Sequence, residues 1–156
     1  MPQHGEVAAL ESGESGVTGG ADDFAHDPRR TFRALVVEDD DAIVTLVRRV
    51  LEREEFTVEC VKSGGAAIEL MKTVAYDLLI LDLMLPFVSG EEVMTFIEET
   101  QPHTLRRVIV MTASPRKLSC EFLQRICKIL AKPFDINELV VMARECAAGV
   151  QACDVR

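Results

Sequence analysis

Short apolar runs alternate with amphipathic segments from residue 33 onward. The run at residues 34–37 is apolar throughout, which favours a strand buried on both faces, whereas residues 56–61 alternate between apolar and polar. Between the runs, apolar residues recur at helical spacing. The predicted strands cover residues 34–37, 56–61, 77–81, 108–111 and 127–131. The predicted helices cover residues 43–51, 66–71, 93–97, 118–126 and 135–146.

Five strand-then-helix units joined by short connections predict an α/β fold. The expected architecture is a five-stranded, doubly wound parallel sheet with helices on both faces. Asp135 and Glu138 have the spacing of a capping box, which predicts where the last helix begins. The chain has no internal repeat and no pattern typical of a second domain.

The N-terminal segment has a different composition from the rest. Residues 1–28 hold five of the nine glycines and six acidic residues, with no lysine or arginine. Such a segment buries too little apolar surface to offset the entropy of ordering it. We therefore expect a flexible tail at residues 1–30, a folded domain at residues 31–148 and a short tail at residues 149–156.

Composition excludes several classes of function. A net charge of −9 argues against nucleic-acid binding, because no basic stripe is available for phosphates. No apolar run approaches the length of a membrane span, and the N-terminus carries no signal-peptide pattern. The five cysteines are odd in number and form no CxxC pair, which favours reduced thiols in the cytoplasm over a disulfide framework. They are Cys60, Cys120, Cys127, Cys146 and Cys153.

Polar groups stand at the C-terminal ends of four predicted strands. Glu38 and Asp39 follow the first strand, Asp82 the third, Thr112 the fourth and Lys132 the fifth. In a doubly wound sheet these ends lie side by side and form the binding crevice. Carboxylates, a hydroxyl and a lysine in one crevice are suited to binding a divalent cation and handling a phosphoryl group.

Asp82 is the strongest candidate in this crevice. An aspartate at a strand end is often only a helix cap, but the residues after Asp82 form a turn with no immediate helix start. We therefore expect no nearby amides for it to cap. Of the adjacent carboxylates, Asp40 or Asp41 is suited to capping the first helix, which leaves Glu38 and Asp39 to face the crevice. Mg²⁺ prefers one or two carboxylates together with phosphate oxygens.

Two further residues complete the candidate site. The Thr112 hydroxyl could donate to a phosphoryl oxygen or simply end its strand. Pro133 predicts an irregular turn that directs Lys132 into the crevice, where its ammonium would offset phosphoryl charge. We expect Phe87 and Phe134 to pack beside the crevice.

Taken together, the motifs resemble the receiver domain of two-component response regulators over residues 32–148. The motifs are Val-Val-Glu-Asp-Asp, Leu-Asp-Leu-Met-Leu-Pro, Val-Met-Thr-Ala and Ala-Lys-Pro-Phe, in that order. The resemblance implies the flavodoxin-like strand order 2-1-3-4-5. It also implies a cytoplasmic signalling module rather than an enzyme, apart from self-phosphorylation from a donor and slow self-dephosphorylation.

The resemblance implies a role for each site residue. Asp82 would take a phosphoryl group from a sensor histidine kinase or a histidine phosphotransfer protein. Glu38, Asp39, Asp82 and the backbone carbonyl of Met84 would hold Mg²⁺ or Mn²⁺. The phosphoryl oxygens would be bound by Thr112, Lys132 and the backbone N–H of Ala113. The phosphorylated form would switch its binding to an output protein, with no nucleic-acid binding and no membrane insertion.

Three departures from the family pattern concern the output. Ile129 occupies a position that is usually aromatic, the segment from Thr112 to Lys132 is slightly short, and no output domain is expected after the last helix. These departures leave open a receiver-like scaffold that binds partners regardless of phosphate. A phosphatase resembling the haloacid dehalogenases is a further alternative, but Met84 occupies the position of the second aspartate that such an enzyme needs.

Overall fold

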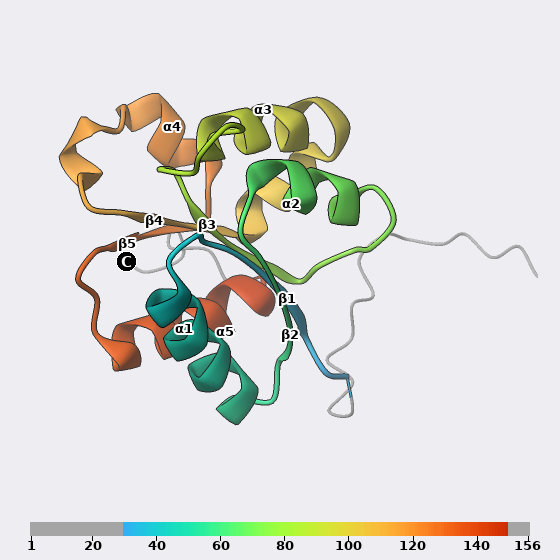
Figure 1. Cartoon of the computed structure of the whole chain (residues 1–156), viewed down its shortest axis with the longest axis vertical. Helices are drawn as coiled ribbons and strands as arrows, with labels where there is room; N and C mark the ends of the chain where they lie inside the picture. Colours follow the sequence, from blue (N-terminus) through green and yellow to red (C-terminus); the bar gives the residue numbers. More distant parts are fainter. Residues whose placement is uncertain (1–29, 150–156) are drawn as a thin grey trace, which may run out of the picture. The chain divides into compact units, whose positions relative to one another are not determined.

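The computed structural model describes residues 30–149 of the chain (Figure 1). The two tails expected from the sequence fall outside the described residues, apart from Arg30 and Gly149. Among the described residues, no helix has both the length and the apolar character needed to cross a membrane.

Five strands form one parallel sheet in the order β2-β1-β3-β4-β5, as the sequence predicts. The chain reverses its direction of winding between β1 and β3, which places a crevice at their carboxyl ends. The strands are β1 (Arg33–Val37), β2 (Thr57–Val61), β3 (Leu78–Asp82), β4 (Val108–Thr112) and β5 (Lys128–Ala131).

The helices follow the strands in alternation. They are α1 (Asp41–Arg53), α2 (Gly64–Met71), α3 (Gly90–Thr100), α4 (Cys120–Arg125) and α5 (Ile136–Ala147), with the 3₁₀ turns η1 (Pro102–Arg107) and η2 (Pro115–Lys117). The fourth helix is six residues long, shorter than the predicted span of residues 118–126, because Ser119 caps its start and the backbone is already extended at Ile126.

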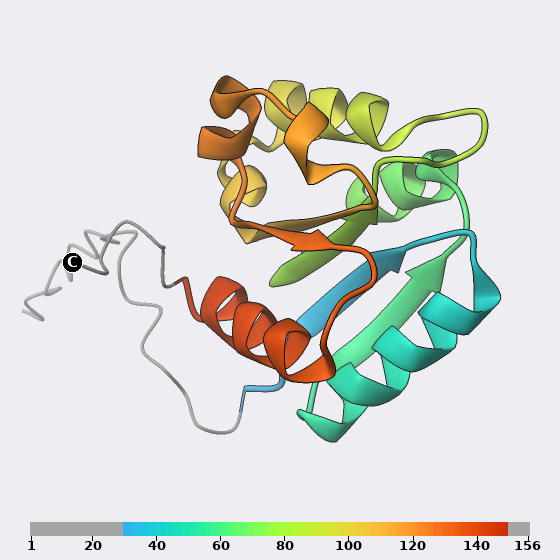
Figure 2. The same ribbon diagram turned by 90° about the vertical axis from the view of Figure 1, so that its left-hand side faces the viewer.

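The helices cover both faces of the sheet (Figures 1 and 2). α1 and α5 pack on one face, and α2, α3 and α4 lie on the other. Successive strand residues point to opposite faces, so each strand contributes to both cores. In β3, for example, Leu79 and Leu81 face α3, whereas Leu78 and Ile80 face α1 and α5.

Side-chain caps determine where the main helices begin. The carboxylate of Asp40 accepts hydrogen bonds from the N–H groups of Ala42 and Ile43, which confirms the predicted cap of α1. Ser89 and Glu92 form a capping box at the start of α3. At α5, Asp135 is the cap as predicted, since its carboxylate accepts from the N–H of Glu138.

The expectation that all cysteines are reduced thiols is wrong for one pair. Cys127 and Cys146 form a disulfide, although 19 positions separate them in the sequence. The fold explains the pairing, because α5 runs back along the sheet and brings its last turn beside the start of β5. Because the two cysteines are far apart in the sequence, they form no local pattern that would indicate the pair. Cys60 and Cys120 are free thiols.

Candidate functional site

The crevice at the carboxyl ends of the strands holds the residues predicted from the sequence. Asp82 is the last residue of β3 and Thr112 the last of β4. Glu38 directly follows β1, and Lys132 directly follows β5. Because β1, β3, β4 and β5 are consecutive neighbours in the sheet, four distant segments of the chain converge here.

Three carboxylates form an acidic cluster in the crevice. Glu38, Asp39 and Asp82 each offer an oxygen, and these oxygens lie within 4.8 Å of one another. Glu38 and Asp82 are buried, at 1% and 3% exposure, whereas Asp39 is exposed. The cluster therefore opens to solvent on the side of Asp39, and its hard oxygen donors suit a divalent cation such as Mg²⁺.

The ammonium of Lys132 lies against two of these carboxylates. Its Nζ is 2.7 Å from Glu38 Oε2 and 3.1 Å from Asp82 Oδ2. Burial by itself lowers the pKa of Lys132, but the hydrogen bonds to Glu38 and Asp82 outweigh burial and raise it. Lys132 therefore remains charged and partly compensates the buried carboxylates.

The pKa of Glu38 is also raised, but here burial is the main cause. Burial raises the pKa of its carboxyl, and the neighbouring charge of Asp82 raises it further. The hydrogen bonds from Lys132 and from the backbone N–H of Asp40 lower the pKa, without cancelling the effect of burial. The ionised form of Glu38 therefore depends on cationic partners.

The expectation that Asp82 has no amide to accept from is wrong. Its Oδ1 accepts a hydrogen bond of 2.9 Å from the backbone N–H of Met84. The turn after β3 folds back over the carboxylate, so that a buried acceptor gains a donor. Met84 thus contacts Asp82 through its N–H, although the residue as a whole is 78% exposed.

Thr112 reaches the site from the neighbouring strand. Its hydroxyl is buried and accepts a hydrogen bond of 3.0 Å from the backbone N–H of Ser114. Its carbonyl accepts a hydrogen bond of 2.8 Å from the N–H of Lys132, which ties the ends of β4 and β5 together. Ala113 lies between Thr112 and Ser114, in the turn after β4, and is exposed. The Lys132–Pro133 peptide bond is cis.

Gly90, the first residue of α3, has a role in the site that was not predicted from the sequence. A Cβ atom at this position would lie 2.5 Å from the backbone oxygen of Asp82 and 2.6 Å from the Cα of Leu83. The start of α3 therefore packs directly on the backbone that carries Asp82. The signal in the sequence was a glycine eight positions after Asp82, placed where a helix begins.

The two phenylalanines near the site behave differently. Phe87 is 100% exposed in the turn between β3 and α3, so the expectation that it packs beside the crevice is wrong. Its backbone has a φ of 64°, in the left-handed region that non-glycine residues seldom adopt. Phe134 does pack, and it lines a hollow of about 410 Å³ together with Ile43, Leu46, Lys132 and Pro133.

Comparisons with known proteins point to one family. Residues 34–144 match the family profile described as "Response regulator receiver domain". The transcriptional regulatory protein TrcR of Mycobacterium tuberculosis is 31% identical over 113 residues, which are 72% of this chain. TrcR is longer, and the matched part is 44% of its length.

Solved structures agree with the sequence comparison. The response regulator TrrA of Thermotoga maritima, solved with Mg²⁺ and beryllofluoride, superposes with a TM-score of 0.66 at 27% identity, covering 74% of this chain and 99% of TrrA. The receiver domain of a Pseudomonas aeruginosa sensor histidine kinase has a magnesium ion in its active-site cleft. It superposes with a TM-score of 0.68 at 25% identity, covering 76% of this chain and 99% of that domain.

Proposed function

Because the chain belongs to the response regulator receiver domain family, we propose that it is a phosphorylation-switched signalling module with Asp82 as phosphoacceptor. One observation supports this most directly. The buried carboxylate of Asp82 lies within reach of both the ammonium of Lys132 and the carboxylates of Glu38 and Asp39. A nucleophile placed between a cation and an acidic cluster is suited to accept a phosphoryl group.

In this proposal, Glu38, Asp39, Asp82 and the carbonyl of Met84 hold Mg²⁺, or Mn²⁺ in its place. The three side chains fit the metal, because hard cations take carboxylate oxygens and the cluster has one open side. When bound, the cation offsets the negative charge that accumulates during phosphoryl transfer.

In this proposal, each residue of the site has its own role in phosphoryl transfer. An oxygen of Asp82 attacks the phosphorus of a phosphohistidine, and the phosphorus–nitrogen bond breaks with its electron pair left on the imidazole. Lys132 exchanges its contact with the Asp82 carboxylate for one with a phosphoryl oxygen. The Thr112 hydroxyl and the N–H of Ala113 bind the remaining oxygens. The family consists of signalling modules, so we expect no turnover of a separate substrate beyond slow self-dephosphorylation.

The proposed phosphoryl donor is a sensor histidine kinase or a histidine phosphotransfer protein in the cytoplasm. The added charge at Asp82 favours one arrangement of the segment around Thr112, and a partner protein binds one arrangement more tightly. Ile129 packs against the core on the side of α2 and α3. An aliphatic side chain there makes the switch independent of the aromatic rotation usual in the family.

The test is intact-mass spectrometry after incubation with Mg²⁺ and a small acyl-phosphate donor. We expect a phosphate-sized mass gain in the wild type, and none with Asp82→Asn or with EDTA. Asp40→Asn is the matched control, since it removes one nearby negative charge and keeps a good helix cap. It should be phosphorylated like the wild type.

Absence of an adduct would be followed by titration with beryllofluoride, a stable mimic of the phosphoryl group. If the wild type bound neither, the phosphoacceptor role would be rejected in favour of a scaffold that binds partners without phosphate.

A further inference from the structure

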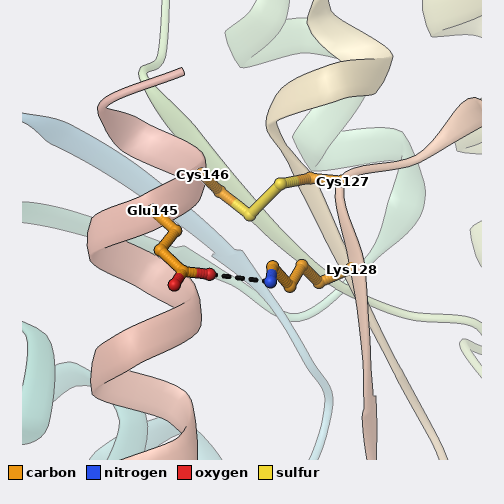
Figure 3. Close-up of a disulfide and its surroundings, with 4 residues drawn as sticks. All are labelled: Cys127, Lys128, Glu145 and Cys146. Atoms are coloured by element: carbon orange, nitrogen blue, oxygen red, sulfur yellow. Dashed lines mark ion pairs between the residues drawn. A yellow bond between two sulfur atoms is a disulfide. The ribbon is translucent and has the colours of Figure 1, made fainter. Parts of the chain in front are cut away.

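The disulfide joins the start of β5 to the last turn of α5, and the crevice lies at the other end of β5. Cys127 precedes the first residue of β5, whereas Lys132 follows its last residue. Cys146 lies in the last turn of α5, with a Cα–Cα distance of 6.1 Å to Cys127 (Figure 3). The bond therefore fixes α5 against the start of β5 and does not contact the crevice.

An ion pair links the same two places. Lys128 and Glu145 are the chain neighbours of the two cysteines, and Lys128 Nζ lies 2.7 Å from Glu145 Oε2 (Figure 3). Across the sheet, the N–H of Cys127 donates to the carbonyl of Val108 at 3.0 Å. The ion pair links the start of β5 to the end of α5, and the hydrogen bond links the start of β5 to β4. Neither contact depends on the bond between the two sulfur atoms.

The two cysteines differ in their access to solvent. Cys127 is partly exposed, whereas Cys146 is 1% exposed and belongs to the apolar core that includes Leu139 and Ala143. A thiolate from solution can therefore reach Cys127. A free cysteine packs well as a small apolar residue, so Cys146 fits this core in its reduced form too. Both redox states are compatible with the fold.

We propose that Cys127 and Cys146 form a reversible thiol–disulfide redox site, opened by a dithiol reductant of the kind that a CxxC oxidoreductase carries. The redox role rests on the cytoplasmic location that is part of the proposed function, because disulfides in a reducing cytoplasm are mostly transient and serve redox sensing or catalysis. The site is separate from the phosphoryl crevice and adds a second input to the same domain.

The exchange balances in two steps. One thiolate of the reductant attacks the sulfur of Cys127, the Cys127–Cys146 bond breaks, and Cys146 takes the electron pair and a proton. The second thiol of the reductant then loses its proton and attacks the reductant's first sulfur, which is bonded to Cys127. The bond to Cys127 breaks, and Cys127 takes the electron pair and a proton to become a thiol. Two electrons pass to the protein, and the reductant becomes a disulfide.

The consequence of opening the bond is local. The last turn of α5 loses its covalent link to the start of β5 and keeps the Lys128–Glu145 ion pair, its apolar packing and the ion pair between Arg144 and Glu54. Lys132, at the other end of β5, keeps its contacts with Thr112, Glu38 and Asp82. Reduction therefore loosens the surface formed by β5 and α5 while the phosphoryl chemistry continues.

The first test equilibrates the native full chain in buffers of graded ratio between reduced and oxidised dithiothreitol. After an acid quench and alkylation, peptide mapping measures the fraction of Cys127–Cys146 cross-link. We expect the cross-link to form and open reversibly without denaturant. A cross-link that never forms would overturn the proposal, as would one that opens only after unfolding. This readout requires no phosphorylation, so its failure is distinct from failure of the proposed function.

The second test measures hydrogen exchange in the oxidised and reduced wild type. Amides in the last turn of α5 should exchange about tenfold faster or more after reduction. Cys127→Ser should exchange like the reduced wild type in every buffer, and Cys120→Ser, at a free and exposed thiol, should still respond to redox. Phosphorylation of Asp82 should proceed at the same rate in both states. Equal exchange in both states, or a changed phosphorylation rate, would overturn the proposal.

Discussion

The central strands and the β5 edge of the sheet are stabilised in different ways. Every residue of β3 and β4 is buried, and their apolar side chains fill both cores. In β5 only Leu130 is fully buried, and the helix before it is six residues long. The edge is instead held by a disulfide and an ion pair to α5. The centre therefore depends on apolar burial, whereas the edge depends on specific links between elements.

The largest effect should come from removing the same side chain in both regions. Ile80 in β3 is fully buried, whereas Ile129 in β5 is partly exposed. We expect Ile80→Ala to lower the free energy of unfolding by about 4 kcal/mol and Ile129→Ala by about 1 to 2 kcal/mol, since a cavity forms only where the surroundings are close-packed. Urea unfolding of both variants measures the difference. Equal losses would show that the edge is packed like the centre.

Gly90 extends the comparison to the contact between α3 and the strand that carries Asp82. Gly90→Ala places a Cβ against the backbone of Asp82 and Leu83, and we expect it to cost about 2 to 3 kcal/mol of stability. Gly65→Ala is the matched control, because Gly65 also lies in the first turn of a helix but has nothing within 4 Å of an added Cβ. The control should be neutral or stabilise the protein by up to about 1 kcal/mol. If Gly90→Ala left the free energy of unfolding unchanged, α3 would be able to shift away from the backbone of Asp82 at little cost.

The smallest effect concerns the ion pair beside the disulfide. Glu145→Gln removes a pair whose side chains are 22% and 39% exposed, so we expect a loss of about 0.5 kcal/mol or less while the disulfide is intact. After reduction the loss should grow, because the ion pair is then the remaining polar link between these two places. Glu69→Gln, in a more exposed pair with Lys72, is the control and should be insensitive to redox. Thermal unfolding with and without reductant measures both.

The same contrast explains how much of the fold followed from sequence. The central strands are uninterrupted apolar runs, so their positions were predicted within a residue or two. The region before β5 was less accurate: the helix predicted over residues 118–126 begins only at Cys120 and ends at Arg125, and a 3₁₀ turn that was not predicted precedes it. Propensity is weak in this segment, and contacts such as the ion pair between Arg125 and Glu98 help to hold it.

In the candidate site, side chains with distinctive chemistry could be predicted from the sequence, whereas contacts that involve the backbone or distant segments could not. Glu38, Asp82, Thr112 and Lys132 were predictable because polar residues at the ends of apolar runs are conspicuous. The N–H of Met84, the tight contact at Gly90 and the Cys127–Cys146 pair were not. Each depends on how the turns and helices return to the sheet, which local pattern does not encode.

The contact between Lys132 and Glu38 joins residues 94 positions apart, and the contact with Asp82 spans 50. During synthesis the chain emerges from its N-terminal end, so the carboxylates leave the ribosome well before the lysine that compensates them. Until then, the first four strands carry an acidic cluster without its cation. The crevice is therefore among the last parts of the domain to be completed, and an unfinished chain lacks the lysine that balances its buried carboxylates.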